Sequence, residues 1–176
     1  MALATTAPAG TWTADRIHSS IGFEVEHMVS TFRGRFEDYD ARLVDGKLIG
    51  TVAVPSVKVY DENLEAHLQS PEFFDAERHP ELRFESSEIR PTGEGDEIVV
   101  DGELTIKGIT KPVEARGTLE GPAVTFGDVN KVGLTLEAII DRTEFGLNWN
   151  APLPKGGFAL ANDVKLIVEL ELAEQA

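Results

Sequence analysis

The side chains best suited to catalysis stand close together near the start of the chain. Asp15, His18 and Ser19 are the residue types of a serine-protease triad, in which a carboxylate orients a histidine base beside the nucleophile. No Gly-x-Ser-x-Gly sequence occurs anywhere, so the sharp turn that exposes such a serine in α/β-hydrolases is missing. We therefore do not expect serine catalysis.

The histidines do not form a short metal-binding motif. His18, His27, His67 and His79 are too widely spaced for one, and the chain has no cysteine to supply thiolate ligands, disulfides or a thiol nucleophile. We expect no metal and no cofactor.

Charge and the N-terminus limit the classes of partner. The net charge of −15 favours solubility and opposes binding to phosphate backbones and anionic membranes. Residues 1–10 lack the basic and apolar parts of a signal peptide, and no stretch approaches the ~20 apolar residues of a membrane span. We expect a cytoplasmic protein with no nucleic-acid partner and no stable membrane insertion. Residues 1–10 should be a disordered lead-in to one domain over residues 11–176.

Apolar residues recur with period two, which is typical of strands with one dry face. The alternation is clear in Ile21–His27, Val132–Ile140 and Val164–Leu172, with glycine-rich turn sequences between such segments. Pattern and turns predict about eight strands and no alternating helices. The predicted strands are Ile17–His27, Phe32–Leu43, Lys47–Val57, Glu81–Ile89, Glu97–Ile106, Lys111–Leu119, Lys131–Asp141 and Asn162–Leu172.

One segment departs from this alternation. Asp61–Leu68 has an acidic start and apolar residues at helical spacing, and Pro71 follows it. We expect one short helix after the third strand. Long strands with one dry face either stack as a sandwich or close into a barrel. A barrel of about eight strands is filled by its own side chains or holds one small ligand.

Several segments, read in order, resemble the YceI-like family of lipocalin-like, polyisoprenoid-binding barrels. The similarity runs from about Trp12 to Leu172. The segments that carry it are Asp15–His27, Gly34–Phe36, His67–Asp75, His79–Ser86, Gly102–Lys111 and Arg142–Gly146. The resemblance implies an all-β fold: a single antiparallel up-and-down barrel whose interior takes a long isoprenoid chain. It also suggests a homodimer, which nothing in the residues requires.

The sequence departs from the family where a charged headgroup would matter. Leu64 and Glu65 stand where the family often has Arg-Asp, and Gln69 stands where it often has Arg. Two cations are thereby lost, which favours a neutral head over a pyrophosphate. Arg33, Arg35 and Lys155 are basic points that a phosphate would need, although surface solvation is the commoner role. A polyprenyl phosphate and a quinone both stay candidate ligands.

Inward-facing residues form the predicted binding site. His27 shares the parity of Ile21, Phe23 and Val25, so it should point inward, either to a headgroup or to a structural partner. Arg142, between Asp141 and Glu144 at a strand end, either closes the barrel as a structural cation or contacts the head. The predicted ligand-binding residues are Ile21, Phe23, Val25, His27, Phe32, Phe36, Val52, Val54, Phe74, Phe84, Leu104, Leu134, Leu136, Arg142, Phe145 and Trp149.

Three functions follow from these patterns. The first is a lipid binder for carriage, storage or sequestration, without catalysis. The second is an enzyme that acts on a lipid inside the same barrel. The third is a structural or interaction module with a filled core. Whichever function holds, the loop Gly146–Pro154 either forms a rim or lid or serves as a dimer contact.

Overall fold

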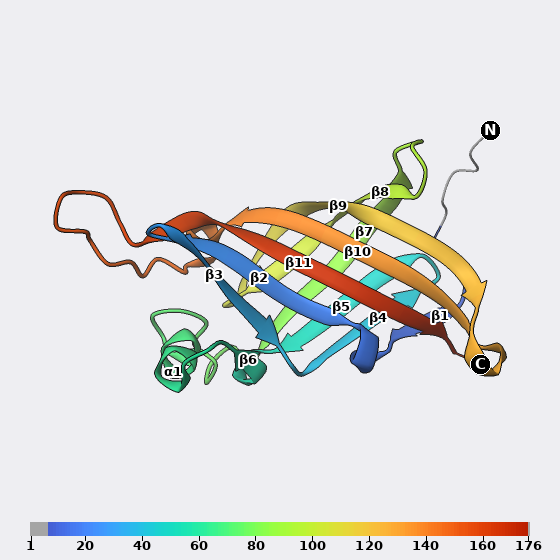
Figure 1. Ribbon diagram of the computed structural model, residues 1–176, viewed down its shortest axis with the longest axis horizontal. Helices are drawn as coiled ribbons and strands as arrows, with labels where there is room; N and C mark the ends of the chain where they lie inside the picture. The colour runs from blue at the N-terminus through green and yellow to red at the C-terminus, as the bar shows by residue number, and fades with distance from the viewer. Residues whose placement is uncertain (1–6, 176) are drawn as a thin grey trace.

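A β-sheet that closes on itself organises the chain (Figure 1). The computed structural model describes residues 7–175. Its strands are β1 (Thr11–Ala14), β2 (Ser20–His27), β3 (Ser30–Phe36), β4 (Tyr39–Val44), β5 (Lys47–Ala53), β6 (Val57–Lys58), β7 (Glu81–Pro91), β8 (Glu97–Ile106), β9 (Ile109–Val124), β10 (Asn130–Asp141) and β11 (Leu160–Glu174). The α-helix is α1 (Glu62–Gln69), and the 3-10 turns are η1 (Arg16–His18), η2 (Val54–Ser56), η3 (Phe126–Asp128) and η4 (Arg142–Phe145).

Strand pairing closes the barrel. Neighbouring strands follow the order β1-β4-β5-β7-β8-β9-β10-β11, and β1 also pairs with β11 to complete a ring of eight antiparallel strands. β2, β3 and β6 extend the sheet beyond β11. The predicted eight-stranded antiparallel up-and-down barrel is confirmed, and from β7 to β11 each strand pairs with the next one in the sequence.

Two of the predicted strands are interrupted by a short turn or bend, and a third begins later than predicted. The side chain of Asp15 accepts the backbone N–H of Ile17 at 3.0 Å and starts η1, which separates β1 from β2. Pro55 in η2 has no N–H to donate, so β5 ends before it and β6 begins after it. The short β1 was not predicted. The interrupted ranges are Phe32–Leu43 and Lys47–Val57, and the strand predicted over Ile17–His27 begins at Ser20.

The predicted helix is present after the third predicted strand as α1. Asp61 caps it, because its side chain accepts the N–H groups of Asn63 and Leu64 at 2.8 and 3.0 Å. Within residues 7–175, no helix combines the length and the apolar character that crossing a membrane requires. Of the predicted lead-in, residues 1–6 lie outside the described residues.

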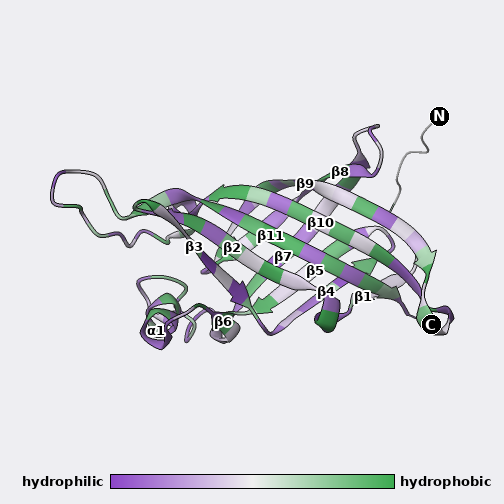
Figure 2. Ribbon diagram, viewed as in Figure 1, coloured by the Kyte–Doolittle hydropathy of each residue, from purple (hydrophilic) through white to green (hydrophobic). Residues whose placement is uncertain are grey.

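Alternation along each strand sorts side chains between the barrel interior and the solvent (Figure 2). In β10, Val132, Leu134, Leu136, Ala138 and Ile140 are buried, while most of the residues between them are exposed or half-buried. Their partners across the sheet are the apolar residues of the same parity in β11. One face of the closed sheet is therefore continuously apolar.

The barrel interior is solid at the end that carries β1. Leu43, Leu119, Val132, Leu134 and Leu172 are almost completely inaccessible there, and their strands are neighbours in the ring. Close packing of this kind leaves no space for a ligand. Any hollow part of the barrel must lie toward the end that carries α1.

Gly117 allows β9 and β10 to approach closely. A Cβ atom at Gly117 would lie 1.7 Å from the carbonyl oxygen of Thr135, whereas one at Gly133 would have no heavy atom within 4 Å. We predict that Gly117→Ala lowers the free energy of unfolding by at least about 1–3 kcal/mol, the usual cost of overpacking. Gly133→Ala is the matched control and should change it by less than about 0.5 kcal/mol. Urea denaturation followed by circular dichroism measures both, and equal effects would contradict the close approach.

Candidate functional site

A cavity of about 320 Å³ opens where the barrel meets α1. Its walls come mainly from β2, β3, β11, α1 and the loop after η4, and most of its lining side chains are apolar. The lining residues are Phe23, Val25, His27, Ser30, Thr31, Phe32, Phe36, Leu64, His67, Leu68, Phe73, Phe74, Leu82, Ile106, Ile140, Arg142, Leu147, Trp149, Leu160, Val164 and Leu166. We call it the outer cavity.

A second cavity of about 130 Å³ lies further into the barrel, and we call it the inner cavity. It shares Phe36, Leu82, Ile106 and Leu166 with the outer cavity.

 The four side chains Phe36, Leu82, Ile106 and Leu166 therefore form the junction between the two cavities. The other inner-cavity residues are Ile21, Gly22, Ala41, Leu48, Gly50, Val52, Arg83, Phe84, Leu104, Val113, Ala115, Leu136, Glu137, Ala138, Val168 and Leu170. The two cavities are therefore adjacent along the barrel, with these four side chains as their shared wall.

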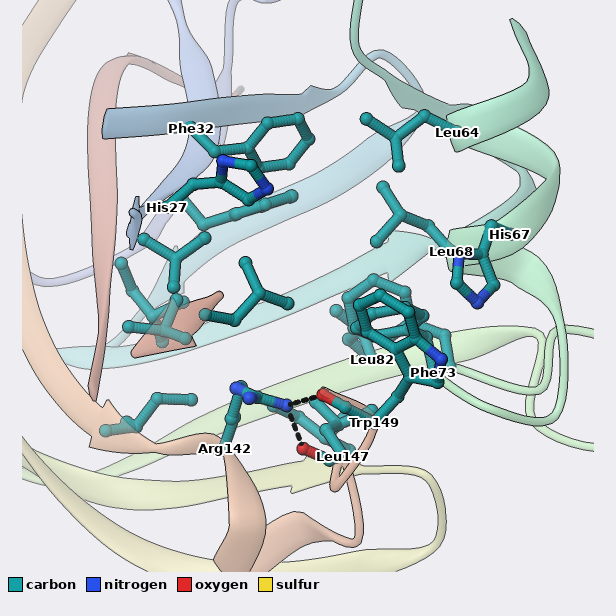
Figure 3. A pocket seen from close by; sticks show the side chains of 18 of the residues that line it. His27, Phe32, Leu64, His67, Leu68, Phe73, Leu82, Arg142, Leu147 and Trp149 are labelled. Carbon is teal, nitrogen blue, oxygen red and sulfur yellow. Dashed lines mark hydrogen bonds between the residues drawn. The ribbon is translucent and has the colours of Figure 1, made fainter. Parts of the chain in front are cut away.

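Helix α1 and the segment after it cover one side of the outer cavity (Figure 3). Leu64 and Leu68 lie on one face of the helix, since residues four apart are neighbours on a helix surface, and both line the cavity. Glu65 fixes the helix to the chain before it by accepting the N–H of Val59 at 3.2 Å. Lys107 donates to the carbonyl oxygen of Pro71 at 2.8 Å and holds the segment that follows.

Aromatic rings line the outer cavity in two groups. The rings of His67, Phe73 and Trp149 pack together with centroid distances of 4.8 to 5.4 Å. Phe36 joins the second group, 5.9 Å from Phe23 and 6.0 Å from Phe74. Such contacts hold the rings in defined positions and make the wall rigid.

Gly34 makes room for one of these rings. A Cβ atom at Gly34 would lie 2.4 Å from Cζ of Phe23, so the ring can lie against the backbone of β3 only because residue 34 is glycine. A larger residue there would push Phe23 into the cavity.

Arg142 is the buried cation of the outer cavity. The residue is 4% exposed, and its Nε donates to the carbonyl oxygen of Ala161 at 2.9 Å. Its Nη1 donates to the carbonyl oxygens of Leu147 and Trp149 at 2.6 and 2.8 Å (Figure 3). Burial lowers the pKa of Arg142, and the nearby charge of Asp141 opposes this. Arg142 thus closes the barrel end structurally, as one of its two predicted roles requires.

The turn η4 aims Arg142 inward. Asp141 caps the turn by accepting the N–H and the hydroxyl of Thr143 at 2.9 and 2.6 Å, and these hydrogen bonds hold the pKa of Asp141 below its usual value. Gly146 ends the turn in the left-handed conformation, with φ of 74°. The pair Asp141 and Glu144 is therefore not a converging acid–base pair, since Asp141 is a cap and Glu144 is exposed.

The structure brings most of the predicted ligand-binding residues to the two cavities. Phe23, Val25, His27, Phe32, Phe36, Phe74, Arg142 and Trp149 line the outer cavity, and Ile21, Phe36, Val52, Phe84, Leu104 and Leu136 line the inner one. Val54, Leu134 and Phe145 line neither, and each is at most 1% exposed. Their position is that of packing residues.

Sequence reasoning missed the contribution of α1 and of β11. Leu64 and Leu68 carried a usable signal, because they fall on one helical face. Val164, Leu166 and Val168 also alternate in β11 on a single parity, which was recognised as a strand pattern but not as a cavity wall.

The residues that resembled a catalytic triad lie away from both cavities. His18 Nδ1 lies 3.0 Å from Asp15 Oδ2 and 3.1 Å from Glu171 Oε2, and Lys131 pairs with the same two carboxylates. The Ser19 hydroxyl oxygen accepts the N–H of Glu171 at 3.0 Å. These contacts fasten β1, β10 and β11 together. The hydrogen bond with His18 is the main cause of a lowered pKa at Asp15.

The predicted basic points are at the surface. Arg33 pairs with Glu24 at 2.9 Å and Arg35 with Glu37 at 3.2 Å, while Lys155 is exposed in the loop before β11. None of the three lines either cavity.

Known proteins share both the sequence and the fold. The chain is 31% identical over 172 residues to a UPF0312 protein of Staphylococcus epidermidis, covering 90% of this chain and 95% of that protein. BcnA of Burkholderia cenocepacia has a similar structure, with a TM-score of 0.77, 24% identity, and coverage of 90% of this chain and 98% of BcnA.

A more distant structural relative extends the fold comparison. It is a polyisoprenoid-binding domain from Saccharophagus degradans, implicated in plant cell wall breakdown, with a TM-score of 0.69 at 9% identity. The alignment covers 96% of this chain and 100% of that domain. The family model of the YceI-like domain matches residues 12–172, and this protein therefore belongs to the YceI-like family.

Proposed function

We propose that the barrel binds a polyisoprenoid or a similar long-chain isoprenoid lipid, for carriage, storage or sequestration and without catalysis. The observation that carries the proposal is the pair of adjacent, mainly apolar cavities, with Phe36, Leu82, Ile106 and Leu166 common to both; a long chain would pass from one to the other along this path. The polyisoprenoid-binding relative from Saccharophagus degradans supports the same ligand class.

The physical properties of the path suit a hydrocarbon chain. Transfer of apolar groups from water yields roughly 0.8 kcal/mol per buried CH₂, so a chain with several isoprene units can offset the loss of its own freedom without many polar contacts. The outer cavity, at about 320 Å³, is within the usual range of ligand pockets. A long chain would use the inner cavity as well.

The chemistry of the walls supports binding rather than catalysis. Among the residues described, the titratable side chains that line the outer cavity are His27, His67 and Arg142, without a carboxylate, and those of the inner cavity are Arg83 and Glu137, both on residues exposed to solvent. Acid–base chemistry on a bound lipid would need a converging pair of such groups. The cytoplasmic location and the homodimer stay predictions.

Narrowing the junction tests whether one chain uses both cavities. We predict that Leu166→Trp lowers the affinity for a prenol of eight isoprene units by about tenfold or more, about 1.4 kcal/mol, because the indole occupies the junction. A prenol of two units should bind nearly as before, since it fits in the outer cavity alone. Fluorescence titration with each prenol measures both affinities.

The control for this substitution is Ile139→Trp, which adds the same side chain on the outside of β10, where Ile139 is 61% exposed. It should leave both affinities unchanged. If Leu166→Trp weakens neither prenol, or both equally, the path through the junction is not used.

The two tryptophans allow the occupied region to be located. Trp149 lines the outer cavity, whereas Trp12 is buried in the solid end of the barrel. A brominated isoprenoid quenches the fluorescence of a tryptophan that it nearly touches. In the variant Trp12→Phe only Trp149 emits, and the ligand should lower this emission by at least about half. In the variant Trp149→Phe only Trp12 emits, and this emission should change little, because the close-packed side chains around Trp12 keep the ligand away from it. The reverse result would place the lipid elsewhere.

A further inference from the structure

We propose that Arg142 recognises the head of the bound lipid, with Nη2 donating a hydrogen bond to a carbonyl-type oxygen inside the outer cavity. The inference rests on the proposed function and specifies the ligand further: an isoprenoid chain that ends in a neutral, hydrogen-bond-accepting head, such as a ketone or quinone.

The hydrogen bonds of Arg142 leave one part of its guanidinium free. Nε and Nη1 donate to three backbone carbonyl oxygens, whereas Nη2 is buried and has no acceptor among the described residues. A buried donor without a partner is costly, and buried polar groups in proteins are rarely left so. Because Arg142 lines the outer cavity, a ligand oxygen there can supply the missing acceptor.

The position of the guanidinium is fixed before a ligand arrives. Its bonds to Ala161, Leu147 and Trp149 join the start of β11 to the loop after η4, and they hold the planar group in one orientation (Figure 3). A donor held in this way loses little freedom when it binds, which favours recognition of one oxygen at one place.

The walls favour a neutral head over a phosphate. Arg142 is the one permanent cation that lines the outer cavity, and it has no ion pair with a described carboxylate. His67 Nε2 already lies 2.5 Å from Glu72 Oε2. A phosphate would bring several charged oxygens out of water, and one free guanidinium nitrogen with His27 cannot replace that hydration. A single carbonyl oxygen needs only one donor.

Two ligands of equal length separate the head from the chain. The first is geranylgeranylacetone, a polyprenyl ketone, and the second is the hydrocarbon in which a CH₂ group replaces its carbonyl. We expect the ketone to bind the unaltered protein about tenfold more tightly than the hydrocarbon. In Arg142→Met the two affinities should become equal. Because both ligands have the same chain, any general damage to the cavity lowers both affinities alike and leaves their ratio unchanged.

A measurement on the unaltered protein covers the case in which Arg142→Met does not fold, since the substitution also frees three carbonyl oxygens. The side-chain ¹⁵N resonances of Arg142 should shift when the ketone binds and stay in place when the hydrocarbon binds. Geranylgeranyl phosphate is the third ligand, and we expect it to bind more weakly than the ketone.

The outcomes distinguish this inference from the proposed function. If the hydrocarbon binds but the ketone binds no better and leaves the Arg142 resonances unshifted, the role of Arg142 is overturned while the lipid-binding proposal stands. Tighter binding of the phosphate overturns the neutral head. If none of the three ligands binds, the proposed function itself fails, and this inference fails with it.

Discussion

Closure of the sheet through the pairing of β1 with β11 is the constraint on which the rest of the structure depends. Once the ring is closed, strand alternation places every second side chain inside a tube of fixed width. Apolar side chains fill this tube at the end that carries β1, whereas toward the other end they line two adjacent cavities. Solid and hollow parts thus arise from the same alternating pattern.

The hollow end depends on elements outside the ring. Helix α1, with Leu64 and Leu68, and the loop that contains Leu147 and Trp149 complete the wall that the strands leave open. Arg142 ties that loop to the start of β11 through backbone carbonyl oxygens, so one side chain both stabilises the end of the barrel and presents a donor to its interior. The structural role and the proposed recognition of a lipid head are therefore compatible in this residue.

The sequence predicts the barrel well because period-two alternation is a local property of each strand. Leu134 and Leu136 illustrate the limit of this reasoning: they share one parity, yet Leu134 is packed in the solid end and Leu136 lines the inner cavity. Parity specifies which face a residue occupies but not how far along the tube space is left. The contacts of Arg142 were equally inaccessible, since they depend on the path of an irregular loop. The start of α1 at Asp61 could be predicted from the sequence, because helix capping depends only on residues close together in the chain.

The central claim is that this tube holds a long apolar molecule, and the most direct measurement is native mass spectrometry of freshly purified protein, followed by denaturing extraction. The account predicts a population heavier than the 19.2 kDa chain, and an extracted isoprenoid lipid that accounts for the difference. Protein that is repeatedly of chain mass alone, and that takes up no added prenyl lipid, would contradict it.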